Sequence, residues 1–276
     1  MNVREAIVQG SADLKFAGIK TPRLDAELLL TFVLKTNRSS LITLEKKKLS
    51  DSNCAKFCEL IERRCNGECV AYLIENKEFR GLDFIVNKYV LVPRPDTETL
   101  VEAAIEQESI NSVLDLCTGS GAVAISLKHE MPKIEMSASD ICENALAVAK
   151  ANAAKLLPKN SIQFYLSDLF NAIPNTKYSM IVSNPPYISS NELKTLSPEV
   201  QNEPSLALAG GVNGLDIIKS IVNKSPDYLQ KGGVLLLEAD PRQMDEISIL
   251  LEKMGFNDIK LYKDLSDSNR VIRGVL

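Results

Sequence analysis

The chain has 276 residues and a formal net charge of −4, and 45% of its residues are hydrophobic. This composition is ordinary for a globular protein with a sizeable core. Its Lys and Arg residues are dispersed, which disfavours a partner bound mainly through phosphate groups. No apolar run approaches the roughly 18 residues of a membrane span, and the N-terminal stretch lacks a signal peptide's apolar segment. We therefore expect a cytoplasmic protein without a direct nucleic-acid or membrane partner.

Residues 1–75 carry helical patterns only. Their apolar residues recur at three- and four-residue spacing in three stretches, 3–18, 22–35 and 50–64. Ser50 or Asp51 is a plausible N-cap for the third. The sequence thus predicts a small helical N-terminal domain.

Four of the six cysteines form two Cys-x-x-x-Cys pairs, Cys54 with Cys58 and Cys65 with Cys69. Such pairs raise the question of a zinc site. Cys54 and Cys58 fall one turn apart on an expected helix, and small buried thiols are common in helix cores. We therefore predict four reduced structural cysteines and no metal.

Two β-rich runs follow the helical region, on either side of the polar pair Asn87–Lys88. Such a pattern predicts a β-hairpin that links two domains. The expected organisation is a helical substrate-recognition domain over 1–75, a hairpin linker over 76–92 and a larger domain over 93–276.

From residue 112 strand and helix patterns alternate, which is the rhythm of an α/β doubly wound parallel sheet. Residues 258–276 hold two β-like runs with no room for a helix between them, so they should close the sheet as an antiparallel pair. The expected parallel strands are 112–117, 135–140, 162–168, 179–184 and 233–240.

The first of these strands leads into a turn of small residues and then a helix, in VLDLCTGSGAVAISL. Ligands of doubly wound sheets bind at the carboxyl ends of the strands, where glycines let the backbone approach them. Gly119 and Gly121 supply that approach. Asp115 lies one step inside the strand end, so it can fix the turn or receive the positive end of a cofactor.

Carboxylates also end the next two strands. Asp140 is placed to accept both hydroxyls of a ribose, although it can instead cap the helix that follows. Asp168 and Leu169 lie where an adenine amino group and ring face can be met. The turn lacks the full glycine fingerprint that a diphosphate needs, which favours S-adenosylmethionine over a nicotinamide dinucleotide.

The fourth strand end carries Asn184, Pro185, Pro186 and Tyr187, in SMIVSNPPYISS. Two consecutive prolines make this strand end rigid. An amide or aromatic NH₂ group is a poor nucleophile because its lone pair is delocalised, so its methylation requires a fixed orientation. The side-chain carbonyl of Asn184 and the backbone carbonyl of Pro185 are the two acceptors expected to fix it. Tyr187 can pack on the planar group.

Five stretches of the chain, in this order, carry a family resemblance: LVPRPDTETLVE, VLDLCTGSGAVAISL, VSNPPYIS, EPSLALAGGVNGLDIIKSI and GGVLLLEADPRQ. They resemble the release-factor glutamine methyltransferases of the PrmC/HemK family along nearly the whole chain. ERRCNGECVAYLIENKEFRGLDF is similar to that family's substrate-recognition domain and connecting hairpin. The resemblance implies a seven-stranded class I methyltransferase sheet, which is Rossmann-like, behind a helical N-terminal domain.

The resemblance also implies the chemistry. The substrate would be the glutamine of the Gly-Gly-Gln motif in class I peptide chain release factors, and we expect the enzyme to be a monomer. Cys117 stands where the family has a glycine, and Leu169 where it often has an aromatic residue. The substrate contacts would be Asn184, Pro185, Pro186 and Tyr187, and the S-adenosylmethionine contacts would be Cys117, Thr118, Gly119, Ser120, Gly121, Asp140, Asp168, Leu169 and Asn184.

Two other functions are compatible with parts of the pattern. A nucleic-acid adenine methyltransferase would share NPPY but needs a basic groove and a pocket for a flipped base, which the net charge disfavours. A catalytically silent cofactor-binding protein would regulate release factors by contact, but it would not need Asn184. Two further features remain open: Glu203–Pro204 is either a substrate clamp or a helix-start turn, and His129 is expected to be structural or exposed.

Overall fold

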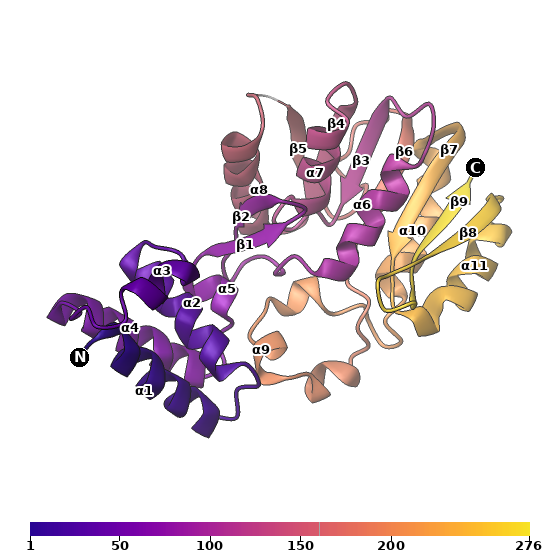
Figure 1. Cartoon of the computed structure of the whole chain (residues 1–276). Helices are drawn as coiled ribbons and strands as arrows, with labels where there is room; N and C mark the ends of the chain where they lie inside the picture. The colour runs from indigo at the N-terminus through magenta and orange to yellow at the C-terminus, as the bar shows by residue number, and fades with distance from the viewer. Residues whose placement is uncertain (160) are drawn as a thin grey trace. The chain divides into compact units, whose positions relative to one another are not determined.

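The computed structural model describes residues 1–159 and 161–276 (Figure 1). Contacts divide these residues into two compact units. The first unit contains residues 1–76 together with residues 197–202, and the second contains residues 77–196 and 203–276. A short segment from the second half of the chain, including α9 (Pro198–Gln201), is therefore part of the helical unit. No helix among the described residues is both long and apolar enough to cross a membrane.

The first unit is helical, as predicted. Its three long helices coincide with the predicted stretches, and Ser50 caps α4 by accepting a hydrogen bond from the Asn53 backbone. Two short helices, α3 and α5, were not predicted because each is too short to show a period. Besides α9, the α-helices of this unit are α1 (Val3–Phe16), α2 (Pro22–Leu34), α3 (Arg38–Thr43), α4 (Asp51–Cys65) and α5 (Val70–Leu73).

The apolar faces of α1, α2 and α4 form the core of this unit around Leu14, Leu30 and Phe57. The cysteines are free, as predicted, but they lie outside the fully buried core, and Cys58 is exposed. Cys54 and Cys65 are partly buried and pack against this core. The buried stripe of α4 instead runs through Phe57, Leu60, Ile61 and Arg64.

A two-stranded hairpin, β1 (Asn76–Phe79) with β2 (Leu82–Ile85), confirms the predicted hairpin. Its turn lies at Arg80–Gly81 rather than at Asn87–Lys88. Both turn residues have positive φ, 49° for Arg80 and 73° for Gly81. This is the backbone geometry that matches the twist of the flanking strands in a tight hairpin, and glycine adopts it without strain.

The second unit is built on a seven-stranded sheet in the order β5-β4-β3-β6-β7-β9-β8. The first five strands of this order are parallel, while β9 is antiparallel to both β7 and β8. Both the parallel sheet and its antiparallel closure are confirmed. The strands are β3 (Ser112–Leu116), β4 (Glu135–Asp140), β5 (Ile162–Leu166), β6 (Tyr178–Ser183), β7 (Leu229–Glu238), β8 (Asn257–Lys263) and β9 (Asn269–Val275).

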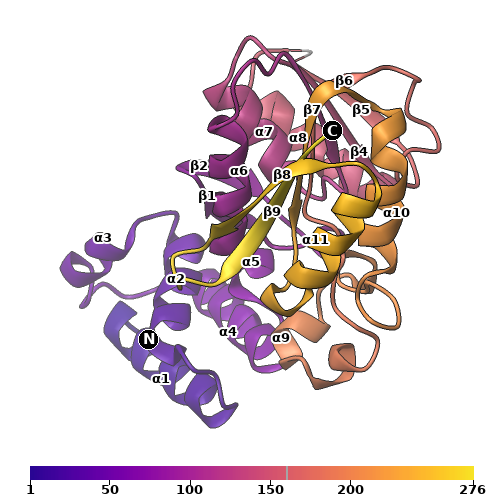
Figure 2. The same cartoon turned by 90° about the vertical axis from the view of Figure 1, so that its right-hand side faces the viewer.

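Helices cover both faces of this sheet (Figures 1 and 2). One face carries α6 (Glu98–Ile105), α7 (Ala122–Glu130) and α8 (Glu143–Leu156). The other carries α10 (Asp216–Lys224) and α11 (Met244–Lys253), which share a buried apolar core with β3, β6 and β7. Because both faces are buried, the central strands are almost continuously apolar.

Candidate active site

The candidate site lies where the strand order reverses. From β3 the chain adds β4 and β5 on one side, and it then returns to add β6 and β7 on the other side. β3 pairs with β4 on one side and with β6 on the other, which makes this edge a topological switch point, the usual ligand site of such sheets. Leu116 of β3 pairs with both Ser139 and Ser183. The residues that follow these three, Cys117, Asp140 and Asn184, are therefore level with one another at one edge.

A cavity of about 230 Å³ opens at this edge. It brings together most of the predicted cofactor residues, although Gly121 is not among those that line it. A Cβ atom at Gly121 would come within 2.9 Å of Ile125 Cδ1 and 3.2 Å of Ala149 Cβ, so this glycine serves the packing of the turn. The predicted cofactor residues that line the cavity are Cys117, Thr118, Gly119, Ser120, Asp140, Asp168, Leu169 and Asn184.

The turn after β3 is left-handed at alternate residues, with φ of 59° at Cys117, 55° at Gly119 and 81° at Gly121. A non-glycine residue pays roughly 1–2 kcal/mol for this conformation, which explains why a glycine suits position 117. Burial raises the pKa of the Cys117 thiol, so the thiol stays protonated. At Gly119 a Cβ atom would meet no protein atom within 4 Å, which leaves open space beside the cavity.

Two carboxylates hold the turn. Asp115 Oδ2 accepts a hydrogen bond from the Thr118 hydroxyl (2.6 Å), which confirms that Asp115 fixes the turn. Asp140 accepts from the backbone N–H of Gly119 and of Cys142, both at 2.9 Å. Cys142, rather than Asp140, is the N-cap residue of α8. A carboxylate has about four lone-pair positions, so Asp140 keeps acceptor capacity for a ligand in the cavity.

The electrostatics of the cavity favour a cationic ligand. Burial raises the pKa of Asp115 to about 7, and Asp140 adds to this rise. Burial also raises the pKa of Asp140, although its backbone hydrogen bonds oppose the rise. A ligand with a positive charge stabilises both ionised carboxylates. S-adenosylmethionine carries a sulfonium and an ammonium group, and its ribose hydroxyls can donate to Asp140, so these residues fit it.

Asn184 is held by a neighbour that sequence reasoning did not identify. Its Nδ2 donates a hydrogen bond to Oγ1 of Thr97 (3.0 Å), at the end of the 3₁₀ turn Pro95–Thr97. The side-chain carbonyl Oδ1 of Asn184 is then the atom left to accept from a substrate. Pro186 lines the cavity with Asn184.

Pro185 and Tyr187 are not among the residues that line the described cavity. Pro185 is buried, and the Tyr187 ring packs against the core on the α10–α11 face. The Tyr187 hydroxyl donates to Oε1 of Glu238 over 3.4 Å. That Tyr187 packs on the acceptor and that the Pro185 carbonyl binds it therefore stay predictions.

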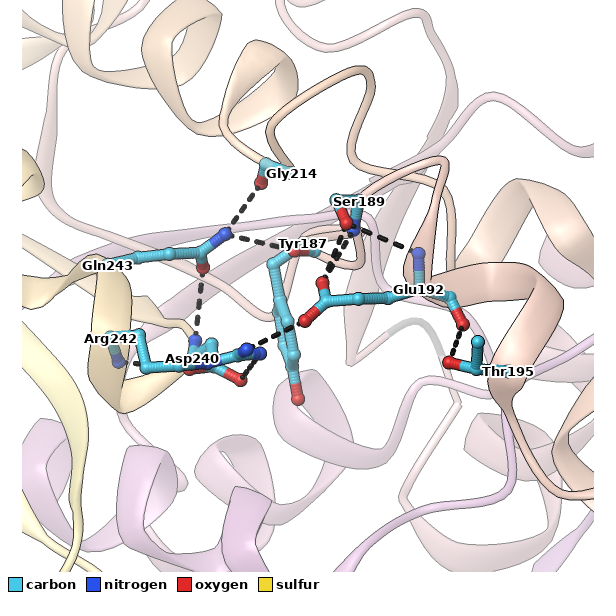
Figure 3. Close-up of polar contacts among 8 residues, drawn as sticks. All are labelled: Tyr187, Ser189, Glu192, Thr195, Gly214, Asp240, Arg242 and Gln243. Atoms are coloured by element: carbon cyan, nitrogen blue, oxygen red, sulfur yellow. Dashed lines mark hydrogen bonds and ion pairs between the residues drawn. The ribbon is translucent and has the colours of Figure 1, made fainter.

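The end of the acceptor motif is fixed from behind by Gln243 (Figure 3). Gln243 Nε2 donates to the backbone carbonyls of Tyr187 (3.0 Å) and Gly214 (3.2 Å), and its Oε1 accepts from Asp240 N (3.2 Å). A Cβ atom at Gly214 would lie 2.2 Å from the Tyr187 carbonyl oxygen. Only glycine allows this approach, so the GGVNG stretch is a support for the acceptor motif.

An ion pair joins the same two stretches of chain (Figure 3). Arg242 contacts both Asp240 and Glu192 at 2.7 Å. Glu192 in turn accepts from the Ser189 hydroxyl (2.7 Å), two residues after Tyr187. The EADPRQ stretch therefore holds Tyr187 through Gln243 and the segment after Tyr187 through Arg242.

Two further stretches of the cavity wall come from residues 88–97 and 204–217, which motif reasoning did not assign to the cofactor. Glu203 is buried and accepts from Val92 N (3.1 Å) while it pairs with Arg94. Its side chain thus anchors the first of these stretches. In the sequence, the signal for this wall was the family resemblance of residues 91–102 and 203–221. His129 is exposed near the end of α7, as expected.

The chain resembles known proteins over its whole length. Two family models match it, the PrmC N-terminal domain over residues 5–74 and the methyltransferase small domain over residues 95–203. The release factor glutamine methyltransferase of Koribacter versatilis is 38% identical, with 99% of this chain and 98% of that protein covered. The protein of the same name from Buchnera aphidicola is 39% identical, with 99% and 98% covered.

Solved structures share the fold of the second unit. A methyltransferase from Pyrococcus furiosus matches with a TM-score of 0.54 and 16% identity over 78% of this chain and 96% of that one. The T. thermophilus 16S rRNA N2 methyltransferase, solved with AdoMet and guanosine, matches with a TM-score of 0.52 and 20% identity over 72% of this chain and 49% of that one. These matches confirm the predicted class I methyltransferase architecture.

Proposed function

The chain belongs to the release factor glutamine methyltransferase family, and from this premise we propose its reaction and substrate motif. It is an S-adenosylmethionine-dependent protein-glutamine methyltransferase that acts on peptide chain release factors. The proposed acceptor is the side-chain amide nitrogen of the glutamine in the Gly-Gly-Gln motif of class I release factors.

The observation that carries the proposal is the position of Asn184. It lies level with the Cys117 turn at the cavity edge, and its Nδ2 group donates a hydrogen bond to Thr97 Oγ1. Asn184 Oδ1 and the Pro185 carbonyl would each accept one N–H of the substrate amide. This fixes the plane of the amide and turns its nitrogen lone pair toward the cavity.

The chain's residues have distinct tasks in this reaction. Bound S-adenosylmethionine supplies an electrophilic methyl group. Asp140 would hold the ribose, Asp115 would face the cationic part, and Leu169 would contact the adenine ring with Asp168 at its amino group. The amide nitrogen would bond to the methyl carbon as the carbon–sulfur bond breaks, and it would then lose a proton to water or a backbone carbonyl.

We assign recognition of the release factor to the helical region over residues 1–75, with 76–92 as the hairpin linker and 93–276 as the methyltransferase domain. The match of residues 5–74 to the PrmC N-terminal domain supports this division. A single short loop offers too little surface for tight binding of a protein, because stable interfaces bury about 1,200 Å² or more. A second contact surface is therefore needed.

The test is mass spectrometry of a purified class I release factor after incubation with the enzyme and S-adenosylmethionine. We expect one added methyl group, located by fragmentation on the glutamine of Gly-Gly-Gln. A release factor with that glutamine changed to glutamate is the control. Methylation of DNA or RNA under the same conditions, with an unmodified release factor, would favour the adenine methyltransferase alternative instead.

A further inference from the structure

The Gln243 side chain joins three separate stretches of chain through its hydrogen bonds (Figure 3). Its Oε1 accepts from Asp240 N (3.2 Å), while its Nε2 donates to the carbonyls of Tyr187 (3.0 Å) and Gly214 (3.2 Å). A backbone N–H only donates and a backbone carbonyl only accepts, so these partners permit one orientation of the Gln243 amide. Both protons of its NH₂ group are thereby used on backbone carbonyls.

One of these hydrogen bonds belongs to a helix start. Asp240 and Gln243 form a capping box at the short 3₁₀ turn Pro241–Gln243, in which Gln243 supplies the acceptor. Glutamate serves in a capping box as well as glutamine does, because only a side-chain oxygen is needed there. The two hydrogen bonds to carbonyls need an NH₂ group, which a carboxylate lacks. Only these two contacts therefore require an amide at position 243.

The backbone around Tyr187 is also held by the glycine loop that follows it in the fold. A Cβ atom at Gly210 would lie 2.8 Å from the Pro186 carbonyl oxygen and 2.7 Å from Tyr187 Cα, so the two backbones touch. The next residue is fixed as well, since Ile188 N donates to the Leu208 carbonyl (3.0 Å) and the Ile188 carbonyl accepts from Gly210 N (2.8 Å). The C-terminal end of the acceptor motif is thus held at consecutive residues.

The torsion angles of the acceptor motif decide where its carbonyl groups point. The proline rings fix φ at residues 185 and 186, but they leave ψ free at both. The ψ angle of Pro185 turns its carbonyl, which is one of the two proposed acceptors for the substrate amide. Asn184 directly follows β6 and donates to Thr97 Oγ1 (3.0 Å), so the N-terminal end of the motif is fixed. Once Tyr187 is held too, the two ψ angles between these ends can no longer change.

We propose that Gln243 is a positioning residue that sets the direction of the Pro185 carbonyl by holding Tyr187. The inference rests on the proposed function, in which that carbonyl and Asn184 Oδ1 accept from the substrate glutamine. Gln243 is not among the described residues that line the cavity, so it acts through the acceptor motif and not on S-adenosylmethionine. Its loss should therefore lower the rate of methyl transfer and leave cofactor affinity unchanged.

Steady-state kinetics with an intact release factor test the proposal. Gln243→Glu keeps the shape and the capping oxygen but removes both donors, so we expect kcat to fall roughly 10- to 100-fold at pH 8, with the Kd of S-adenosylmethionine unchanged. Gln230→Glu is the matched control, because Gln230 Nε2 donates to the Lys177 carbonyl (3.2 Å) at the other end of β7. Wild-type kcat in Gln243→Glu would overturn the proposal.

The pH profile separates the two donors from a general loss of structure. The carboxyl group introduced by Gln243→Glu would face two carbonyl oxygens, which disfavour its ionised form and raise its pKa. Its protonated form has one O–H donor, so kcat relative to wild type should recover in part as the pH falls from 8 to 6. Gln243→Met has no donor at any pH and should show no such recovery. Parallel profiles of the two variants would overturn the part assigned to the donors.

Backbone amide exchange gives a readout that needs no substrate. The N–H groups of Ile188 and Gly210 belong to the contacts that hold the end of the acceptor motif. We expect both to exchange with water roughly tenfold faster or more in Gln243→Glu than in wild type. The control is Gly119 N, which donates to Asp140 (2.9 Å) and should exchange equally in both proteins.

The outcomes of this exchange experiment separate the inference from the proposed function. Equal exchange at Ile188 in wild type and Gln243→Glu would overturn the inference, whatever the enzyme methylates. A failure of wild type to methylate release factors, with the exchange difference present, would instead overturn the proposed function alone.

Discussion

The side chain of Asp140, at the end of β4, accepts a hydrogen bond from the backbone N–H of Gly119 in the turn after β3, with an N···O distance of 2.9 Å. Its other oxygen accepts from Cys142 N before α8. One carboxylate therefore fixes two walls of the cavity and still has acceptor capacity for a ligand. Asp140 does not cap α8, whose N-cap residue is Cys142, and its contact with a ribose stays a prediction.

Replacement of Asp140 by Ala should weaken S-adenosylmethionine binding roughly 10- to 100-fold, because charge-assisted hydrogen bonds contribute about 1.5–3 kcal/mol. Calorimetric titration measures the Kd directly. Asp245→Ala, at an exposed aspartate in α11, is the control. An unchanged Kd in Asp140→Ala would leave Asp140 with its structural hydrogen bonds alone.

Cofactor affinity should rise with pH through the titration of Asp115. Its pKa is about 7 in the free protein because the carboxyl group is buried. A cationic ligand favours the ionised form, so binding must release a proton below that pKa, and affinity falls by up to about tenfold per pH unit there. Above pH 7 affinity should level off.

Calorimetry at pH 6, 7 and 8 in buffers of different ionisation enthalpy measures both affinity and proton release. The control is Asp115→Asn, which cannot titrate and should show a flatter pH profile. A wild-type Kd that does not change between pH 6 and pH 8 would remove Asp115 from cofactor binding.

The sheet could be predicted from sequence because each strand is a short apolar run with a clear end. Strands that end in Asp140 and Asn184 form one edge in any parallel sheet, so most of the predicted cofactor residues share a cavity. The hairpin turn was misplaced because Asn87–Lys88 looks more like a turn than Arg80–Gly81. Only the backbone angles of the folded chain distinguish the two.

The supporting residues could not be predicted in the same way. Thr97 lies 87 positions before Asn184, and Glu203 lies 111 positions after Val92, so no local pattern joins either pair. Gln243 shows the same limit, because its contacts to Tyr187 and Gly214 arise only when three loops meet. Motifs identify residues that touch ligands more easily than residues that hold those motifs in place.

Removal of the Asn184 side chain should abolish most methyl transfer while the fold and cofactor binding persist. Its carbonyl orients the acceptor, and loss of such an orienting group typically costs about 100-fold or more in rate. Turnover of Asn184→Ala with saturating release factor measures the loss, and the Kd of S-adenosylmethionine controls for binding. More than about a tenth of wild-type turnover would contradict the acceptor assignment.

Glu238→Gln should be more stable than wild type at neutral and higher pH. Burial raises the pKa of Glu238 from its ordinary 4.5 to about 7, despite Thr97, Tyr187 and Arg270 beside it, while Asp96 adds to the rise. The unfolded chain therefore ionises first, and wild-type stability falls as pH rises from about 4.5 to about 7. Glutamine avoids this loss, which is on the order of 3 kcal/mol at pH 8.

Urea unfolding of both proteins at pH 5 and pH 8 measures this difference. Asp115 titrates in the same range, but it is present in both proteins and cancels in the comparison. We expect nearly equal free energies of unfolding at pH 5 and a more stable variant at pH 8. A less stable Glu238→Gln at pH 8 would mean that the carboxylate contributes to folding rather than opposes it.

The last prediction concerns the helical unit. Every residue that lines the cavity lies between Lys88 and Ile217, so a chain that begins at Lys77 should bind S-adenosylmethionine with nearly the wild-type Kd. It should methylate an intact release factor with a much lower kcat/KM, because the remote binding surface is gone. A peptide with the Gly-Gly-Gln loop should be an equally weak substrate of both enzymes.

Truncation has a second effect that needs its own control. Within the helical unit, buried Arg64 pairs with Asp25 at 2.8 Å and with Glu199, and Asn202 donates to the Gly67 carbonyl (2.9 Å). The shortened chain therefore also loses the partners of residues 197–202.

Glu199→Ala in the full-length chain is the control variant. It breaks the contact between Arg64 and Glu199 but keeps the helices, and Arg64 keeps its pair with Asp25. If Glu199→Ala lowers activity on peptide and protein equally while truncation affects mainly the protein, residues 1–76 recognise the release factor. Equal losses on both substrates after truncation would instead make the helical unit a support for the loop that carries residues 197–202.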